Sequence, residues 1–269
     1  QQAEASQKRI NEFLNTPVDK LNEFDKPLQI NGDVIFKNIY FTFKETKIKA
    51  LNNISFNVKR GEKIAIMGDV GSGKSTILEL ISGVYKPDYG NILIDNANTK
   101  NINLTDLRKY IGYVPQSTFL FSDTIANNIK FGNQEASKDE VIESAKIACL
   151  FDDVNDFKDK FNTLLGERGV NLSGGQKQRL AIARAIIKKP NILLLDDSLS
   201  AVDTETEEKI ISNIENNTKK TTVFISTHRV STSKNCDKII VLNKGFIESF
   251  GTHEELMKEK KSYFSIYTK

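Results

Sequence analysis

Short apolar runs alternate with segments of helical period through the middle and the end of the chain. Ile64–Met67 runs into Gly68, Asn191–Leu195 ends at Asp196, and Thr222–Ile225 forms a third such run. Continuous apolar runs of this length are typical of parallel strands that are buried on both faces. The pattern predicts an α/β core made of residues 62–94, 110–116 and 191–243.

Two further layers are expected around this core. Residues 33–60 alternate apolar and polar positions, which indicates antiparallel strands with one buried face. Helical patterns between Gln116 and the glycine turn at residues 172–176 indicate an inserted helical subdomain at about residues 117–175. The remaining predicted elements are helices at about 124–129 and 139–150, a hairpin of Lys238–Leu242 and Phe246–Phe250 around Asn243-Lys244-Gly245, and two short terminal helices.

The first 30 residues differ from this pattern. Residues 1–15 read as a helix with an apolar stripe around Phe13, and a polar connector bracketed by prolines follows. We expect residues 1–30 to be a linker that follows a transmembrane domain, and residues 31–269 to be one domain. No apolar run approaches the ~20 residues that a membrane-spanning helix needs.

Composition narrows the classes of function. The net charge is +3, and 39% of the residues are hydrophobic. Without a basic tract, a charge this small does not indicate a nucleic-acid partner. The two cysteines, Cys149 and Cys236, form no C-x-x-C pair, as suits a reducing compartment.

The segment after the first apolar run is a phosphate-binding loop. Gly68-Asp69-Val70-Gly71-Ser72-Gly73-Lys74-Ser75, followed by Thr76, fits G-x-x-x-x-G-K-[ST] between a strand and a helix. Its glycines let backbone amides approach the α- and β-phosphates of ATP. Lys74 reaches the β- and γ-oxygens, and the Ser75 hydroxyl joins the coordination shell of Mg²⁺.

An acidic residue ends the second apolar run. Asp196 lies at the carboxyl end of a strand that is expected to be central in the sheet. Ligands of open α/β sheets bind at that edge, so we expect Asp196 to hold Mg²⁺ through water, together with Ser75.

A second glycine turn, Leu172-Ser173-Gly174-Gly175-Gln176, opens a long helix. A serine hydroxyl and glycine amides at a helix N-terminus form an anion site, because unpaired N–H groups and the helix dipole point at the ligand. The chain thus carries two phosphate sites, although one bound nucleotide needs a single site.

With loop, glycine turn and acidic strand in this order, the chain resembles the nucleotide-binding domain of ABC transporters from about Asn31 to Lys269. The resemblance implies an α/β fold: a P-loop NTPase (RecA-like) core with an antiparallel β subdomain and an inserted α-helical subdomain. It also implies that two such domains pair head to tail. Each signature turn, here Ser173–Gln176, then reaches the ATP that the other chain's phosphate loop holds.

Further motifs take their roles from this resemblance. Gln116 looks like the Q-loop glutamine, which senses Mg²⁺, and His228 looks like the switch histidine at the γ-phosphate. The segment Ser200–Asp203 looks like the D-loop, which crosses between paired subunits. Phe43 occupies the place where the family stacks an aromatic ring on adenine, and the alternatives are Tyr40 and Phe41.

Two segments resemble the exporter branch of the family. Gly166–Gly169 looks like the exporter X-loop, and Phe119–Ile125 resembles the stretch that receives a coupling helix of the membrane domain. The alternative is that Phe119 and Phe121 belong to the core of the helical subdomain. The resemblance implies that the domain lies on the cytoplasmic face of the cell membrane, as part of a membrane transporter.

One position departs from the family's pattern. After the acidic strand the family places a glutamate, the general base that orients or activates the attacking water, and here that position is Asp197. One methylene withdraws the carboxylate by roughly 1.5 Å, and a misplacement of about 1 Å can cost ~100-fold in rate. We therefore expect slow hydrolysis at this site, with Asp197, His228 and Gln116 as its catalytic residues. The chain then resembles one half of a heterodimeric exporter whose partner carries the glutamate.

Other functions are open at this point. A soluble ABC ATPase that acts on DNA or ribosomes is one alternative, but DNA-repair members separate the two phosphate turns by long coiled coils, and translation-type members carry two cassettes. A non-hydrolytic regulatory ATP-binding module is favoured by Asp197. An importer subunit is the third alternative. These residues do not indicate the transported substrate, because the membrane domain determines substrate selectivity.

Overall fold

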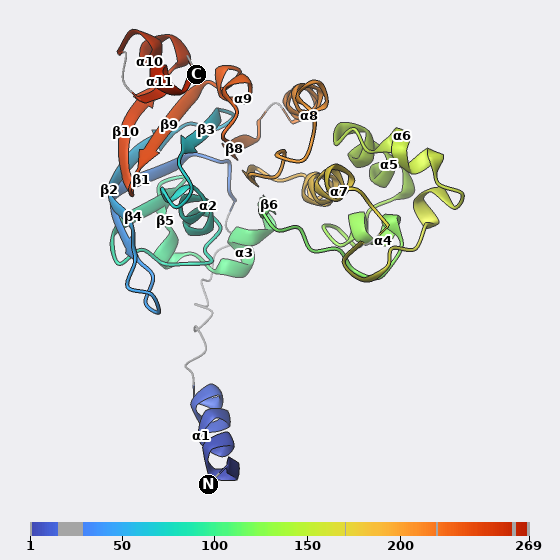
Figure 1. Ribbon diagram of the computed structural model, residues 1–269, viewed down its shortest axis with the longest axis horizontal. Coiled ribbons are helices and arrows are strands. Elements are labelled where there is room, and N and C mark those ends of the chain that lie inside the picture. The colour runs from blue at the N-terminus through green and yellow to red at the C-terminus, as the bar shows by residue number, and fades with distance from the viewer. Residues whose placement is uncertain (1, 16–28, 170, 219, 260–261, 268–269) are drawn as a thin grey trace.

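The computed structural model describes residues 2–15, 29–169, 171–218, 220–259 and 262–267. They form two sheets, a group of helices on one side, and a separate N-terminal helix, α1 (Gln2–Leu14) (Figure 1). Most of the predicted connector, residues 16–28, lies outside the described residues. Among the described helices, none combines the length and the apolar character that a bilayer crossing requires.

The smaller sheet has four strands in the order β2-β1-β4-β5, all antiparallel. Its strands are β1 (Val34–Thr42), β2 (Lys49–Val58), β4 (Tyr89–Ile94) and β5 (Ala97–Asn98). The prediction for residues 33–60 is confirmed. Assigning residues 89–94 to the α/β core was wrong, because β4 pairs with β1 and buries only its Ile92 and Ile94 face against the interior.

The larger sheet has six strands in the order β10-β9-β3-β8-β7-β6. Its strands are β3 (Lys63–Gly68), β6 (Ile111–Val114), β7 (Ile192–Asp196), β8 (Thr222–Ser226), β9 (Lys238–Asn243) and β10 (Phe246–Gly251). All neighbours are parallel except β10, which pairs antiparallel with β9 as the predicted hairpin. The carboxyl ends of β3, β6, β7 and β8 therefore meet at one edge.

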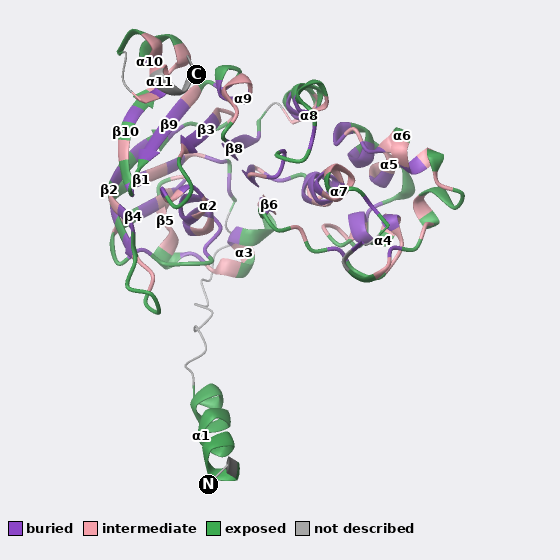
Figure 2. Cartoon of the chain, viewed as in Figure 1, coloured by how far each residue is buried: buried purple, intermediate pink, exposed green. Residues whose placement is uncertain are grey.

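The parallel strands are buried on both faces, as Figure 2 shows. Along β3, Ile64 and Ile66 belong to a hydrophobic cluster shared with the antiparallel sheet, whereas Ala65 and Met67 face a second cluster. This alternation explains why the strands read as continuous apolar runs. The helices that pack around the core sheet are α2 (Lys74–Ile81), α3 (Leu104–Lys109), α8 (Thr204–Asn217), α9 (Val230–Lys234), α10 (His253–Glu259) and α11 (Ser262–Tyr267).

The segment between β6 and β7 contributes the group of helices on one side of Figure 1. These are α4 (Ile125–Lys130), α5 (Lys138–Ile147), α6 (Phe151–Asp156) and α7 (Gly174–Ile186). The predicted helix over 139–150 ends earlier, because Cys149 adopts a left-handed conformation with φ 51° that a helix does not tolerate. Helix α6, which follows this break, was not predicted.

Candidate nucleotide-binding site

The phosphate-binding loop connects β3 to α2 and depends on glycine at both ends. Gly68 has φ +145°, and a Cβ there would lie 2.3 Å from the Leu242 carbonyl oxygen. Gly73 has φ +106°, and its Cβ would lie 2.7 Å from a methyl carbon of Leu51. Only glycine combines this backbone conformation with this close approach, so the loop keeps its amides at the surface of the site.

Lys74 begins α2 and folds back over the loop. Its Nζ donates hydrogen bonds to the carbonyl oxygens of Gly68, at 2.7 Å, and Asp69, at 2.9 Å. Burial lowers the pKa of this ammonium, while the nearby carboxylates of Asp197 and Asp196 act in the opposite direction. The cation is thus held where phosphate oxygens could replace the two carbonyls as acceptors.

The two residues predicted to hold Mg²⁺, Ser75 and Asp196, are in direct contact. The Ser75 hydroxyl in the first turn of α2 donates a 3.0 Å hydrogen bond to Oδ1 of Asp196 at the end of β7. Asp196 is only 3% exposed. Burial raises the pKa of its carboxyl, and the Ser75 hydrogen bond opposes the rise. A hydroxyl and a buried carboxylate are the oxygen ligands that Mg²⁺ prefers.

The three predicted catalytic residues follow three neighbouring strands. Gln116 follows β6, Asp197 follows β7, and His228 follows β8, so all lie at the same edge of the sheet. Gln116 Nε2 donates a long, 3.4 Å hydrogen bond to Asp197 Oδ2. With Lys74 and Ser75 they line a cavity of about 290 Å³ at the phosphate-binding loop.

An aromatic residue closes one end of this cavity. Phe43 lines it together with Ile48, and its ring packs edge-on against Phe41, with ring centres 5.0 Å apart. Phe41 is buried, and Tyr40 packs instead against Tyr89, with ring centres 6.4 Å apart. Of the three candidates for adenine stacking, Phe43 is therefore the one that borders the cavity.

The residues present fit ATP and Mg²⁺. The buried hydroxyl of Ser72, within the phosphate-binding loop, has no hydrogen-bond partner among the described residues. Buried polar groups are normally paired, so this hydroxyl points to a polar ligand at the loop. The described residues contain no cluster of three or more His, Cys, Asp or Glu side chains that could hold a metal unaided. Mg²⁺ here would therefore keep phosphate and water ligands, as it usually does.

The second glycine turn lies elsewhere. Ser173 caps α7: its hydroxyl accepts from the Gln176 amide at 3.2 Å, and the Gln176 side chain accepts from the Ser173 amide at 3.0 Å. Ser173 and Gly174 are exposed. The amides of Gly174 and Gly175, in the first helical turn, have no intrahelical acceptor. None of these described residues lines the cavity at the phosphate-binding loop.

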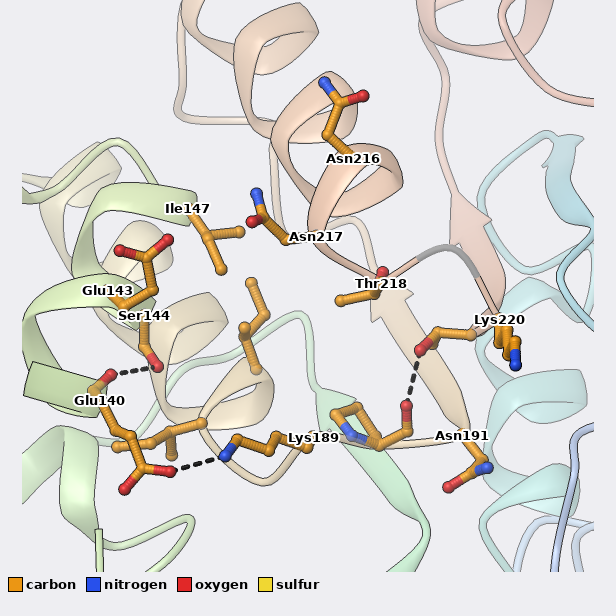
Figure 3. A pocket seen from close by; sticks show the side chains of 14 residues that line it. Glu140, Glu143, Ser144, Ile147, Lys189, Asn191, Asn216, Asn217, Thr218 and Lys220 are labelled. Carbon is orange, nitrogen blue, oxygen red and sulfur yellow. Dashed lines mark hydrogen bonds and ion pairs between the residues drawn. The ribbon is translucent and has the colours of Figure 1, made fainter. Parts of the chain in front are cut away.

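Cavity size alone does not identify the site. A larger cavity of about 630 Å³ lies between α5, the end of α7 and the end of α8 (Figure 3). Glu140 and Lys189 form a 2.6 Å ion pair at its wall. Within the described part of the chain, its lining contains none of the predicted site residues.

The exporter-type segment after Gln116 exposes its aromatic residues. Phe119 is 54% exposed and Phe121 is 36% exposed, so the alternative that both belong to the core was wrong. Their rings pack edge-on at 5.2 Å, and the guanidinium of Arg184 lies 5.5 Å from the Phe121 ring. In the other exporter-type segment, Gly166–Gly169, the last three residues form a short 3₁₀ turn.

Sequence reasoning missed two features of the site. Ser226, which ends β8 beside Asp196 in the sheet register, lines the cavity. Its place directly after a predicted strand of the same edge was the signal that could have found it. Arg229, next to His228, makes contacts that depend on distant backbone carbonyls, and no local pattern indicates these.

A sequence profile described as ABC transporter matches residues 51–200, which is more than half of the chain. The chain belongs to the ABC transporter family. As an ABC transporter ATP-binding domain, it has the α/β P-loop fold that the resemblance implied.

Proteins similar to this ABC domain include an ABC exporter of known structure, which confirms the resemblance to an exporter-type domain. The chain is 44% identical over 98% of its length to the uncharacterized ABC transporter ATP-binding protein YfiB of Bacillus subtilis, of which it covers 46%. It is 41% identical over 98% of its length to the alpha-hemolysin translocation ATP-binding protein HlyB of Escherichia coli O157:H7, of which it covers 38%. The solved structure of a bacterial Atm1-family ABC exporter with ATP bound matches with a TM-score of 0.91 and 36% identity, covering 99% of this chain and 47% of that one. The ABC domain thus spans less than half the length of these relatives.

Proposed function

We propose that this ABC domain is the ATP-driven motor of an exporter and that it pairs head to tail with a second ATP-binding domain. One observation carries the pairing. The phosphate-binding cavity has Lys74, Ser75 and Asp196 on its walls but not the signature turn, while Ser173 and Gly174 of that turn are exposed. An anion site that faces away from its own nucleotide is suited to the nucleotide of a partner.

Each residue then has a defined task. Lys74 and the loop amides bind the phosphates, Ser75 and Asp196 hold Mg²⁺ with Gln116 nearby, and Phe43 stacks on adenine. Bound Mg²⁺ neutralises phosphate charge and positions the oxygens of the scissile bond. His228, exposed at the same edge, donates a hydrogen bond to the γ-phosphate. Loss of that phosphate removes contacts from both chains, so the pair separates.

This domain's own site is expected to turn over slowly. Asp197 has φ +46° and accepts a long, 3.4 Å hydrogen bond from Gln116. Its carboxylate stops one methylene short of the glutamate that the family uses to orient water. A partner chain that carries the glutamate, completed by this chain's Ser173–Gln176 turn, would be the fast site of a heterodimer.

The membrane side of the motor would be the exposed aromatic cluster of Phe119, Phe121 and Phe131. Its rings pack together, with Phe121 and Phe131 centres 4.5 Å apart, and offer an apolar surface at the helical subdomain. A coupling helix of a transmembrane domain suits such a surface. With such a contact, we propose that the chain works at the cytoplasmic face of the cell membrane.

A regulatory ATP-binding module is the second candidate, and Asp197 is the residue that favours it. The two functions differ in whether this chain's own site releases phosphate when the natural partner is present. A motor subunit raises the turnover of the pair, and its Asp197→Glu variant raises it further. A regulatory module changes the partner's rate without contributing phosphate release of its own.

Sedimentation of the chain with Mg²⁺ and ATP tests the pairing. The wild-type chain should form an ATP-dependent dimer, and Ser173→Arg should abolish that dimer while leaving ATP binding to the monomer unchanged. Ser137→Arg is the matched control, because Ser137 caps α5 through reciprocal hydrogen bonds with Glu140, as Ser173 caps α7 with Gln176, but lies away from the signature turn. Equal loss of dimer in both variants, or none in either, would contradict the proposal.

A further inference from the structure

The loop Ser200–Asp203 is fixed to the signature helix α7 on one side. The Ala201 amide donates a 2.9 Å hydrogen bond to Gln178 Oε1, and Gln178 Nε2 donates to the Ser200 hydroxyl at 3.1 Å. The Gln178 side chain is buried. A Cβ on Gly175 would lie 2.9 Å from the Ala201 carbonyl oxygen, so the start of α7 packs directly on this loop.

A guanidinium group holds the same loop from the other side. Arg229 Nη1 donates to the Val202 carbonyl oxygen at 2.7 Å, and Nη2 donates to the Ser200 carbonyl oxygen at 2.9 Å. Arg229 directly follows His228 and is the N-cap residue of α9. Arg229, next to His228, is therefore hydrogen-bonded to the backbone of the loop Ser200–Asp203. In the proposed function this loop contacts the partner chain.

A buried carboxylate fixes that guanidinium. Glu207, in the first part of α8, is only 1% exposed, and it accepts hydrogen bonds from Arg229 Nη1 and from the Thr232 hydroxyl of α9. Without Arg229, the buried Glu207 carboxylate would lack its charged partner, so the pair favours one arrangement. Asp203, the last residue of the loop, is also fixed. Its carboxylate accepts a 2.9 Å hydrogen bond from the Thr206 amide and caps α8.

We infer that Arg229, held by Glu207, is a positioning residue that transmits movement of the His228 segment to the loop Ser200–Asp203, and through Gln178 to the signature helix. The inference rests on the proposed function, which supplies the γ-phosphate at His228 and the partner at the loop. Its physical basis is a rigid chain of hydrogen bonds: His228 and Arg229 are adjacent, and Arg229 is bonded to two carbonyls of the loop.

Arginine is required for this task because of its geometry. The planar fork presents several N–H donors at once and here reaches two carbonyl oxygens and one carboxylate. Lysine keeps the charge beside Glu207, but a single ammonium nitrogen cannot span the same three acceptors. Arg229→Lys therefore separates the positioning role from the charge.

Amide hydrogen exchange of the 269-residue chain tests the inference, at a concentration where the chain is monomeric, with and without Mg²⁺ and ATP. In the wild type, nucleotide should slow exchange both at residues 227–229 and at Ala201 and Val202. In Arg229→Lys the effect at 227–229 should persist, and the effect at the loop should fall at least about fivefold. Nucleotide protection of the loop that survives in Arg229→Lys would overturn the inference.

Two further variants keep the outcome interpretable. Glu207→Gln keeps an acceptor for Arg229 but removes the charge, so it should weaken the nucleotide effect at the loop less than Arg229→Lys does. Lys209→Gln is the control, since it breaks only the exposed Glu205–Lys209 pair on the outside of α8 and should behave like the wild type. If nucleotide slows exchange nowhere in the wild type, the proposed ATP site itself fails. If it slows 227–229 but never the loop, only the present inference fails.

Discussion

Ser75 and Asp196 are 121 positions apart in sequence, yet the Ser75 hydroxyl donates a 3.0 Å hydrogen bond to the Asp196 carboxylate. The contact joins the first turn of α2 to the end of β7, and both groups face the cavity at the phosphate-binding loop. It brings a hydroxyl and a buried carboxylate to one point. The proposed Mg²⁺ site is built on this pair.

Ser75→Ala should weaken binding of Mg²⁺–ATP by about tenfold, which corresponds to about 1.4 kcal/mol, and should leave the affinity for ATP without Mg²⁺ nearly unchanged. The hydroxyl is lost as a metal ligand, whereas the loop amides and Lys74 remain. Ser75→Thr, which keeps a hydroxyl, is the control and should bind like the wild type. Titration calorimetry with and without Mg²⁺ measures this. Equal loss of affinity under both conditions would show that Ser75 does not act through the metal.

Asp197→Glu should raise ATP hydrolysis by the paired chain on the order of 10- to 100-fold, because the carboxylate regains the reach that water activation needs. Phosphate release at saturating Mg²⁺–ATP checks this. Asp197→Asn is the control and should lower the residual rate instead. An unchanged rate in Asp197→Glu would mean that the missing methylene does not limit this site.

Gly68→Ala should cost about 3 kcal/mol or more in the free energy of unfolding, since its Cβ would meet the Leu242 carbonyl oxygen in a backbone conformation that L-residues rarely adopt. Gly71→Ala is the matched comparison. Gly71 has φ +78° but no atom within 4 Å of its Cβ position, so the cost should be only about 1–2 kcal/mol. Urea denaturation separates the two. Equal losses would contradict the close approach at Gly68.

Glu140 should make stability depend on acid pH. A hydrogen bond from Lys189 and one from the Ser137 amide lower the pKa of its carboxyl from 4.5 to about 2. Because the folded-state pKa is depressed, this contribution is present above pH 4.5 and is lost as the pH falls toward 2. The stability difference between wild type and Glu140→Gln, from urea unfolding at pH 7 to pH 3, should therefore shrink below pH 4.5. A difference that stays constant over this range would contradict the shift.

Local patterns were sufficient for the elements that carry the site. The apolar run Ile64–Met67 and the glycine spacing after it predicted a buried strand and the phosphate-binding loop, because the positive φ angles that the loop requires select glycine at fixed positions. The place of Asp196 at the carboxyl edge followed from the parallel strands, whereas Gln116, Asp197 and His228 were assigned to the site through the resemblance to the family. For the loop and for Asp196 the physical constraint is local or follows from sheet topology.

Features that depend on tertiary contacts were not predictable in the same way. Strand β4 reads like its neighbours in sequence, and only its pairing with β1 shows that it belongs to the antiparallel sheet. The left-handed Cys149 that ends α5 leaves no clear signal, since cysteine does not favour that conformation. Arg229 donates hydrogen bonds to the carbonyls of Ser200 and Val202. Every residue has a backbone carbonyl, so the sequence does not indicate which ones an arginine contacts.

Mixing two inactive variants tests most directly whether one nucleotide is shared by two chains. Lys74→Ala removes a phosphate ligand, and Ser173→Arg blocks the signature turn, so neither variant alone should form an ATP-dependent dimer of full stability. In a shared site, the mixture restores one complete site from Lys74 of one chain and Ser173 of the other. Sedimentation with Mg²⁺ and ATP is predicted to show a dimer for the mixture and not for either variant by itself. A mixture that stays monomeric while the wild type dimerises would contradict the shared site.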